Sequence, residues 1–100
     1  MSDHDAALAF LERFCAGSIE SLVPLLDERL EVTGPFHRFT WRTAYLDRLT
    51  ADPPQPCEYQ VLSVTAGDDT VAVFYDYRKG DGVLTIAQLF RFRNHLIVKM

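Results

Sequence analysis

A single amide, Gln88, lies in an otherwise apolar stretch near the end of the chain. Side chains of an extended strand alternate between two faces, so one face carries Leu84, Ile86, Gln88, Phe90 and Phe92. The other four side chains of this set are large and apolar, which predicts that the face is buried. A buried amide without a hydrogen-bond partner costs about 1–3 kcal/mol. The pattern therefore predicts a cavity in which a ligand, a water molecule or a second polar residue meets Gln88.

Two further side chains, Tyr75 and His37, are candidate catalytic residues because each could transfer a proton. Tyr75 is expected on the same side of the sheet as Gln88, where its hydroxyl would orient a ligand or carry a proton. His37 follows a Gly-Pro-Phe tripeptide in a loop, and histidine titrates near neutral pH. A tyrosine packed in the core and an exposed loop histidine are the simpler interpretations, and both stay open.

The composition excludes several classes of protein. One hundred residues with 48% hydrophobic and 24% charged content suit one domain, residues 1–100. The formal charge of −4 argues against a nucleic-acid partner. The three histidines lack metal-ligand spacing, and no glycine-rich phosphate loop is present, so neither a metal nor a cofactor is predicted.

The expected location of the chain is the cytoplasm. Residues 1–7 lack the basic start and apolar core of a signal peptide, and no apolar run is long enough to span a membrane. In that reducing compartment, Cys15 and Cys57 are expected to be free thiols with structural roles.

The residues that carry these groups need helices and a sheet to position them. Apolar spacing predicts helices over 2–17, 18–26 and 40–52, the last capped by Thr40, although Pro24 is awkward inside the second. Alternating residues then predict strands over 30–33, 58–65, 70–78, 83–93 and 96–98. Helices followed by an antiparallel meander make an α+β fold.

The central strands are apolar on both faces. One face can pack on the helices, and the outer face would then expose Leu62, Val64, Phe74 and Leu89. A contiguous apolar patch of this kind usually marks an interface, so a homodimer through the outer sheet face is predicted.

Three stretches of the chain resemble the NTF2-like superfamily, and within it the SnoaL-like and ketosteroid-isomerase-like proteins. They are FCAGSIESL at 14–22, LEVTGP at 30–35 and LFRF at 89–92. The resemblance covers nearly the whole chain. It implies a cone in which three N-terminal helices pack on a curved antiparallel or mixed sheet around an apolar pocket, commonly in a dimer.

The same resemblance argues against steroid isomerisation. That chemistry uses an aspartate base, with a tyrosine and a protonated aspartate that hold the oxyanion. In this chain Gly34 falls where the base would be, Phe10 replaces the tyrosine and Gln88 replaces the protonated aspartate. An amide can donate a hydrogen bond but carries no proton at neutral pH.

The main hypothesis is therefore a SnoaL-like protein that binds a small apolar ligand in the cone-shaped pocket. The predicted ligand-binding residues are Phe10, Phe14, Tyr45, Leu49, Val73, Tyr75, Ile86, Gln88, Phe90 and Phe92. One alternative is a cyclase, isomerase or dehydratase acting on a polyketide-like or terpenoid substrate through His37 or Tyr75. The other is a dimeric interaction module whose pocket is filled by side chains.

Overall fold

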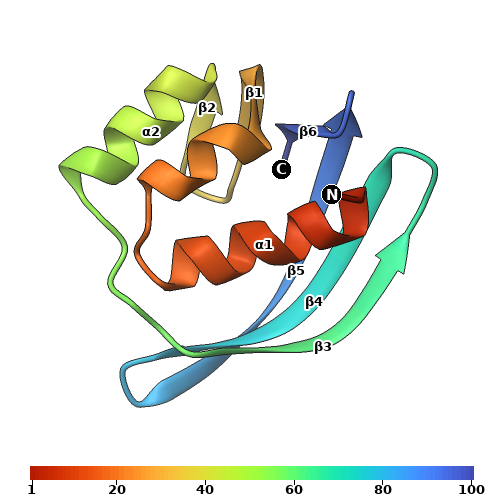
Figure 1. The fold of residues 1–100 in the computed structure, drawn as a ribbon. Coiled ribbons are helices and arrows are strands. Elements are labelled where there is room, and N and C mark those ends of the chain that lie inside the picture. The colour runs from red at the N-terminus through yellow and green to blue at the C-terminus, as the bar shows by residue number, and fades with distance from the viewer.

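The computed structural model describes residues 1–100, apart from the side chain of Lys79. The helices are α1 (Asp3–Cys15), the 3-10 helix η1 (Glu20–Leu25) and α2 (Arg42–Ala51). The strands are β1 (Leu26–Thr33), β2 (Arg38–Thr40), β3 (Tyr59–Ala66), β4 (Thr70–Lys79), β5 (Gly82–Arg93) and β6 (Leu96–Lys99). Figure 1 shows the long strands β3, β4 and β5 curving beneath α1, which confirms the predicted α+β cone.

Helix α1 forms where its capping residues and apolar spacing predict it. The Ser2 hydroxyl accepts a hydrogen bond from the backbone N–H of Asp5 at 3.1 Å, and Asp3 and Asp5 lie at the positive end of the helix dipole. Gly17 follows the helix with φ of +75°, a conformation that favours glycine. The helix thus presents one buried face to the sheet, formed by Ala6, Ala7, Phe10, Leu11 and Cys15.

The second predicted helix is shorter and tighter than the apolar spacing indicated. Only residues Glu20–Leu25 are helical, in the 3-10 form, and Ser18 does not cap them with its side chain. Pro24 has no N–H to donate to the preceding turn, so it disfavours a regular α-helix there. The chain is already extended at Leu26, and β1 is longer than the predicted strand over 30–33.

The start of α2 also differs from the prediction. Thr40 belongs to β2, a strand that the sequence did not predict, and therefore cannot cap the helix. Trp41 occupies the capping position with φ of +107°, and its backbone N–H donates to the carbonyl of Leu30 at 2.8 Å. That bond to β1 holds the turn between β2 and α2 in place.

The six strands form one mixed sheet with the order β2-β1-β6-β5-β4-β3. Strands β1 and β6 are parallel, and the other neighbouring pairs are antiparallel. A bulge in β3 between Val61 and Ser63 shifts the alternation, so that Val64 lies opposite Val73 and packs partly buried against the core. The prediction that Val64 faces outward was therefore wrong, because a period of two does not survive a bulge.

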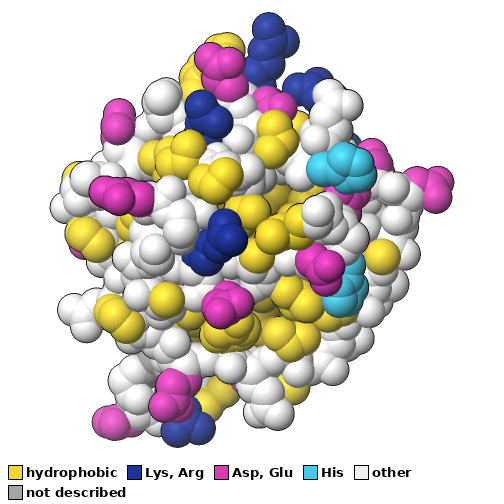
Figure 2. Space-filling model, in the orientation of Figure 1, with side chains coloured by type: hydrophobic (Ala, Val, Ile, Leu, Met, Phe, Trp, Pro, Cys, Tyr) yellow, Lys and Arg dark blue, Asp and Glu magenta, His cyan; other side chains and the backbone are white. Residues whose placement is uncertain are grey.

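The core lies between α1 and the concave face of the sheet. Phe90 on β5 is fully buried and meets Phe10 of α1 edge to face, with ring centroids 5.6 Å apart. Figure 2 shows hydrophobic side chains gathered along the middle of this side of the molecule, with charged side chains mostly toward its margins. Leu62, Phe74 and Leu89 on the convex face remain exposed, as predicted.

Candidate functional site

Gln88 forms a hydrogen bond with a second polar residue, as its position on an apolar face predicted. It lies on β5 opposite Val73, on the concave side of the sheet, and is partly buried. The hydroxyl of Tyr75, on the neighbouring strand β4, donates a hydrogen bond to Gln88 Oε1 at 2.8 Å. The tyrosine therefore satisfies the carbonyl half of the amide and fixes its orientation.

The amino half of the Gln88 amide is less well satisfied. Its Nε2 atom lies 3.8 Å from the Sδ atom of Met100, and a thioether is a weak acceptor. An amide nitrogen carries two N–H groups, so Gln88 has donor capacity left over. The pair Tyr75–Gln88 is thus arranged to offer an N–H to a further acceptor.

A cavity of about 330 Å³ lies beside this amide. It is lined by Thr33, Ala87, Gln88, Leu89, Arg91, Lys99 and Met100. Strand β6 ends at Lys99 and pairs with β5 only over 91–93, so in the described chain no strand borders residues 82–90 of β5 on that side. The cavity is a notch in the sheet at this point.

The rim of the notch is positively charged. Arg91 of β5 lies directly opposite Lys99 of β6, and like charges in such positions repel. Lys99 is balanced in part by Glu31 of β1, with 4.0 Å between Nζ and Oε2. Ala87, Leu89 and Met100 supply the apolar part of the wall. The notch therefore combines an apolar wall, an amide donor and a cationic rim.

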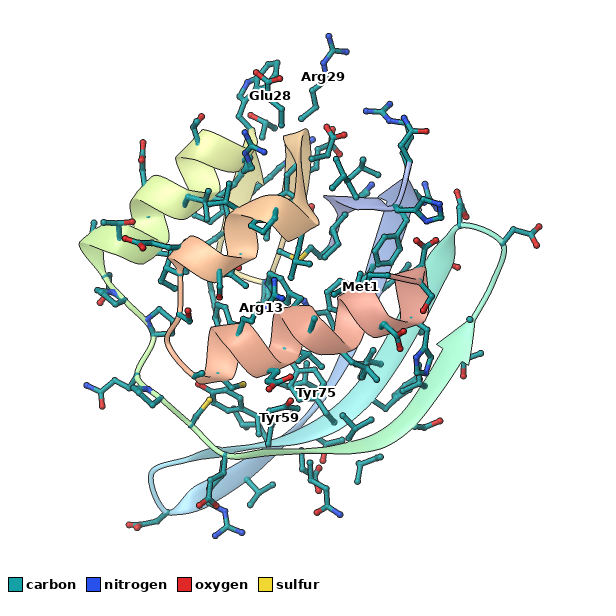
Figure 3. The ribbon with its side chains drawn as sticks, viewed as in Figure 1. Met1, Arg13, Glu28, Arg29, Tyr59 and Tyr75 are labelled. Atoms are coloured by element: carbon teal, nitrogen blue, oxygen red, sulfur yellow. The ribbon has the colours of Figure 1, made fainter. Side chains whose placement is uncertain are left out.

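Tyr75 acts in this arrangement as a donor. Burial is the largest cause that raises its pKa to about 12, with smaller contributions from Cys15 and Tyr77. The phenol consequently keeps its proton at neutral pH. Figure 3 shows Tyr75 and Tyr59 between α1 and the sheet, and their ring centroids are 6.5 Å apart in an edge-to-face arrangement.

Most of the predicted ligand-binding residues lie in the packed core. Those buried in it are Phe10, Tyr45, Leu49, Val73, Tyr75, Phe90 and Phe92, while Phe14 and Ile86 pack partly buried against it. Of the predicted set, only Gln88 lines the notch. The structure thus brings Gln88 and Tyr75 together, and it places the aromatic side chains behind them as support.

The three other lining residues that lie on β5 were missed for one reason. Ala87, Leu89 and Arg91 alternate with Gln88, so a period of two places them on the outer face of the sheet, as the structure does, and not on the side of Gln88. The notch lies beside the edge of β5 and is open to both faces of the sheet. Side chains from both faces of the strand therefore line it. The short last strand was the one feature of the sequence that could have indicated the notch. The position of the notch, however, depends on which residues of β5 pair with β6.

His37 lies apart from the notch lining. It is exposed, and its ring stacks on Phe39 with centroids 6.1 Å apart. No described carboxylate lies within ion-pair distance of it, and no described group of three His, Cys, Asp or Glu side chains could hold a metal ion. None of the described helices is long and apolar enough to cross a membrane.

A second hollow, of about 240 Å³, lies at the other end of the sheet. It is lined by Glu58, Tyr59, Gln60, Asp76, Arg78 and Val83. Its charged groups already have partners: Arg78 lies 3.8 Å from Glu58, and Asp76 accepts a hydrogen bond from Thr85 at 2.7 Å. The notch beside Gln88 is therefore the better candidate for a binding site.

Comparison with known proteins adds a family and a fold. Residues 7–100 match the SnoaL-like domain family. None of the curated proteins matches the chain at a significant level.

Three solved structures illustrate the shared fold. An NTF2-like protein of unknown function from Cytophaga hutchinsonii superposes with a TM-score of 0.83 at 15% identity, covering 99% of this chain and 86% of that one. A protein proposed to be a ketosteroid isomerase, from Kribbella flavida, gives 0.84 at 21% identity, with coverages of 97% and 73%. An LEH-like epoxide hydrolase from M. tuberculosis gives 0.79 at 14% identity, with coverages of 97% and 77%. At these identities the likeness shows the fold alone.

Proposed function

The chain belongs to the SnoaL-like domain family, and from that premise we propose that it binds a small, largely apolar molecule carrying a carbonyl or hydroxyl oxygen. The observation that supports this most strongly is the Gln88 amide beside the notch. Its oxygen is held by Tyr75 at 2.8 Å, while its nitrogen meets only the sulfur of Met100 among the described side chains.

The proposed pose follows from these contacts. The ligand oxygen accepts a hydrogen bond from Gln88 Nε2 in place of the weak contact with Met100. The apolar body of the ligand lies against Ala87, Leu89 and the Met100 side chain. A pocket that is mostly apolar, with few convergent polar groups, is the usual make-up of a small-molecule site.

The proposal is tested by changing Gln88 to Leu and measuring the binding of two shape-matched probes. Camphor is a bicyclic terpenoid ketone, and camphene is a hydrocarbon of nearly the same shape. We expect Gln88→Leu to weaken camphor binding by about 5- to 150-fold, because one hydrogen bond of about 1–3 kcal/mol is lost. Camphene binding should stay within about twofold. Isothermal titration with each probe gives both affinities.

Gln60→Leu is the matched control for this experiment. It makes the same chemical change at an exposed glutamine of β3 that lines the other hollow. Camphor affinity should not respond to it. Equal losses from both glutamine variants, or no loss from Gln88→Leu, would contradict the proposed role. In the wild-type protein, the side-chain amide resonance of Gln88 should also shift on addition of camphor.

The enzymatic alternative is less well supported. A cyclase, isomerase or dehydratase needs a group that takes up a proton from the substrate. Burial raises the pKa of Tyr75 to about 12, so its phenol is protonated at neutral pH and cannot act as that base. His37 is exposed and does not line the notch. The chain therefore supplies hydrogen-bond donors here, and binding is the function that its geometry supports best.

A second proposal concerns the convex face of the sheet, where a specific observation favours an interface between two copies of the chain. Leu62, Phe74 and Leu89 are 51%, 42% and 54% exposed on three adjacent strands. A continuous apolar patch on a sheet is commonly covered by a partner.

We expect Phe74→Asp to convert a homodimer into a monomer, since it places a charge in the middle of this patch. Sedimentation velocity measures the change directly. Phe36→Asp is the control, because Phe36 is an exposed apolar residue in the loop between β1 and β2. A wild-type chain that sediments as a monomer, or a dimer that tolerates Phe74→Asp, would sink this proposal.

A further inference from the structure

The two cysteines of the chain, which are far apart in sequence, lie next to each other in the fold. Cys15 is the last residue of α1, and Cys57 precedes β3. The backbone N–H of Cys57 donates to the carbonyl of Cys15 at 2.9 Å. A contact of this kind holds two residues at about the Cα separation that disulfides span, roughly 4.4–6.8 Å.

The segment that carries Cys57 is packed against the end of α1. A Cβ atom added to Gly17 would lie 3.6 Å from Cγ of Pro56 and 3.7 Å from the carbonyl oxygen of Pro54, so the segment is in close contact there. Figure 1 shows this connector passing beneath the end of α1 on its way to β3. The neighbourhood of the two cysteines is therefore set by the fold.

The two thiols differ in accessibility. Cys15 is buried, and Cys57 is half-buried. Burial, which is the largest cause, and the adjoining Cys57 side chain together raise the pKa of Cys15 to about 12. Cys57 is thus the thiol that a reagent in solution can reach, and Cys15 is positioned to react second.

We propose that Cys15 and Cys57 form a reversible disulfide that joins the end of α1 to the start of β3. The function proposed for Gln88 does not enter this argument. In a reducing compartment the resting state is the dithiol found here.

The oxidant in this proposal is a low-molecular-weight disulfide such as oxidised glutathione. Cys57, as its thiolate, attacks one glutathione sulfur; the S–S bond breaks, and one glutathione leaves and takes up the proton that Cys57 lost. Cys15 then gives up its proton and attacks the Cys57 sulfur of the mixed disulfide. The second glutathione leaves with that proton. Two protein thiols and one glutathione disulfide thus become one protein disulfide and two glutathione thiols.

The test equilibrates the wild-type protein in graded mixtures of reduced and oxidised glutathione, followed by acid quenching, alkylation and peptide mass spectrometry. The expected product is one intramolecular bond between the peptides of Cys15 and Cys57. Because the bond closes a long loop, the oxidised protein should melt roughly 10 °C or more above the reduced protein. Two thiols that stay alkylatable, bonds only between chains, or an unchanged Tm would overturn the proposal.

Two variants test the order of attack. Cys15→Ala should stop at a stable glutathione adduct on Cys57, because no second thiol is present to displace it. Cys57→Ser should remain unmodified, since Cys15 is buried. A glutathione adduct on Cys15 in the second variant would refute the assigned order.

Discussion

Replacing Phe90 with Ala is expected to lower the free energy of unfolding by about 3–5 kcal/mol. Phe90 is fully buried, and its ring packs edge to face on Phe10 at 5.6 Å. The substitution removes most of the apolar area that the residue buries and leaves a cavity between α1 and β5. Denaturant unfolding followed by circular dichroism measures the loss, which is a large fraction of the stability of a typical domain.

Leu84→Ala is the matched control on the same strand and the same face. Leu84 is 55% exposed, because the concave face of β5 extends there beyond the core. Its truncation should cost about 1 kcal/mol or less. If both variants lost a similar free energy of unfolding, the contribution of a side chain would depend on its face of β5 alone and not on whether α1 covers it.

The contrast between Phe90 and Leu84 also shows how far the sequence could be read. Alternation on β5 correctly placed both residues, together with Gln88, on one face. Alternation carries no information about where a covering helix stops, so it overestimated the burial of Leu84. Alternation in the sequence thus predicted which face of the sheet a side chain lies on, but not whether that side chain is buried.

Other differences came from local chemistry that competes with periodicity. Pro24 shortened the second predicted helix to a 3-10 segment, and the bulge after Val61 turned Val64 inward. The family resemblance was confirmed, and it carried the prediction of the cone where periodicity alone could not. The overall fold was therefore predictable from the sequence, while its irregular positions were not.

The sequence predicted the central pair of the candidate site, Gln88 and Tyr75, but not the rest of the lining of the notch. The reasoning that found Gln88 was energetic: a lone amide on an apolar face needs a partner, and Tyr75 is that partner. The notch itself depends on which strand pairs with β5 and where that pairing ends. Pairing between distant segments is a property of the folded chain, so the cationic rim of Arg91 and Lys99 could not be anticipated.

Because Tyr75 and Gln88 share a hydrogen bond, we expect that the stability losses from replacing each of them are not additive. Gln88→Leu should destabilise the fold by about 1–3 kcal/mol, because it leaves a buried Tyr75 hydroxyl without its acceptor. Tyr75→Phe should cost less, since Gln88 is only partly buried and water can reach its oxygen. When both groups are removed, no polar atom is left unpaired. The double variant should therefore be at least about 1 kcal/mol more stable than the sum of the single losses predicts.

This double-mutant cycle is measured by denaturant unfolding of the wild type, the two single variants and the double variant. Tyr75→Phe combined with Gln60→Leu serves as the reference, because Gln60 is exposed on β3 and makes no hydrogen bond with Tyr75. That pair should be additive within about 0.5 kcal/mol. Additivity in the Tyr75–Gln88 cycle would show that the amide is not held by the tyrosine. The Gln88 side chain would then lack the fixed orientation on which ligand recognition at the notch depends.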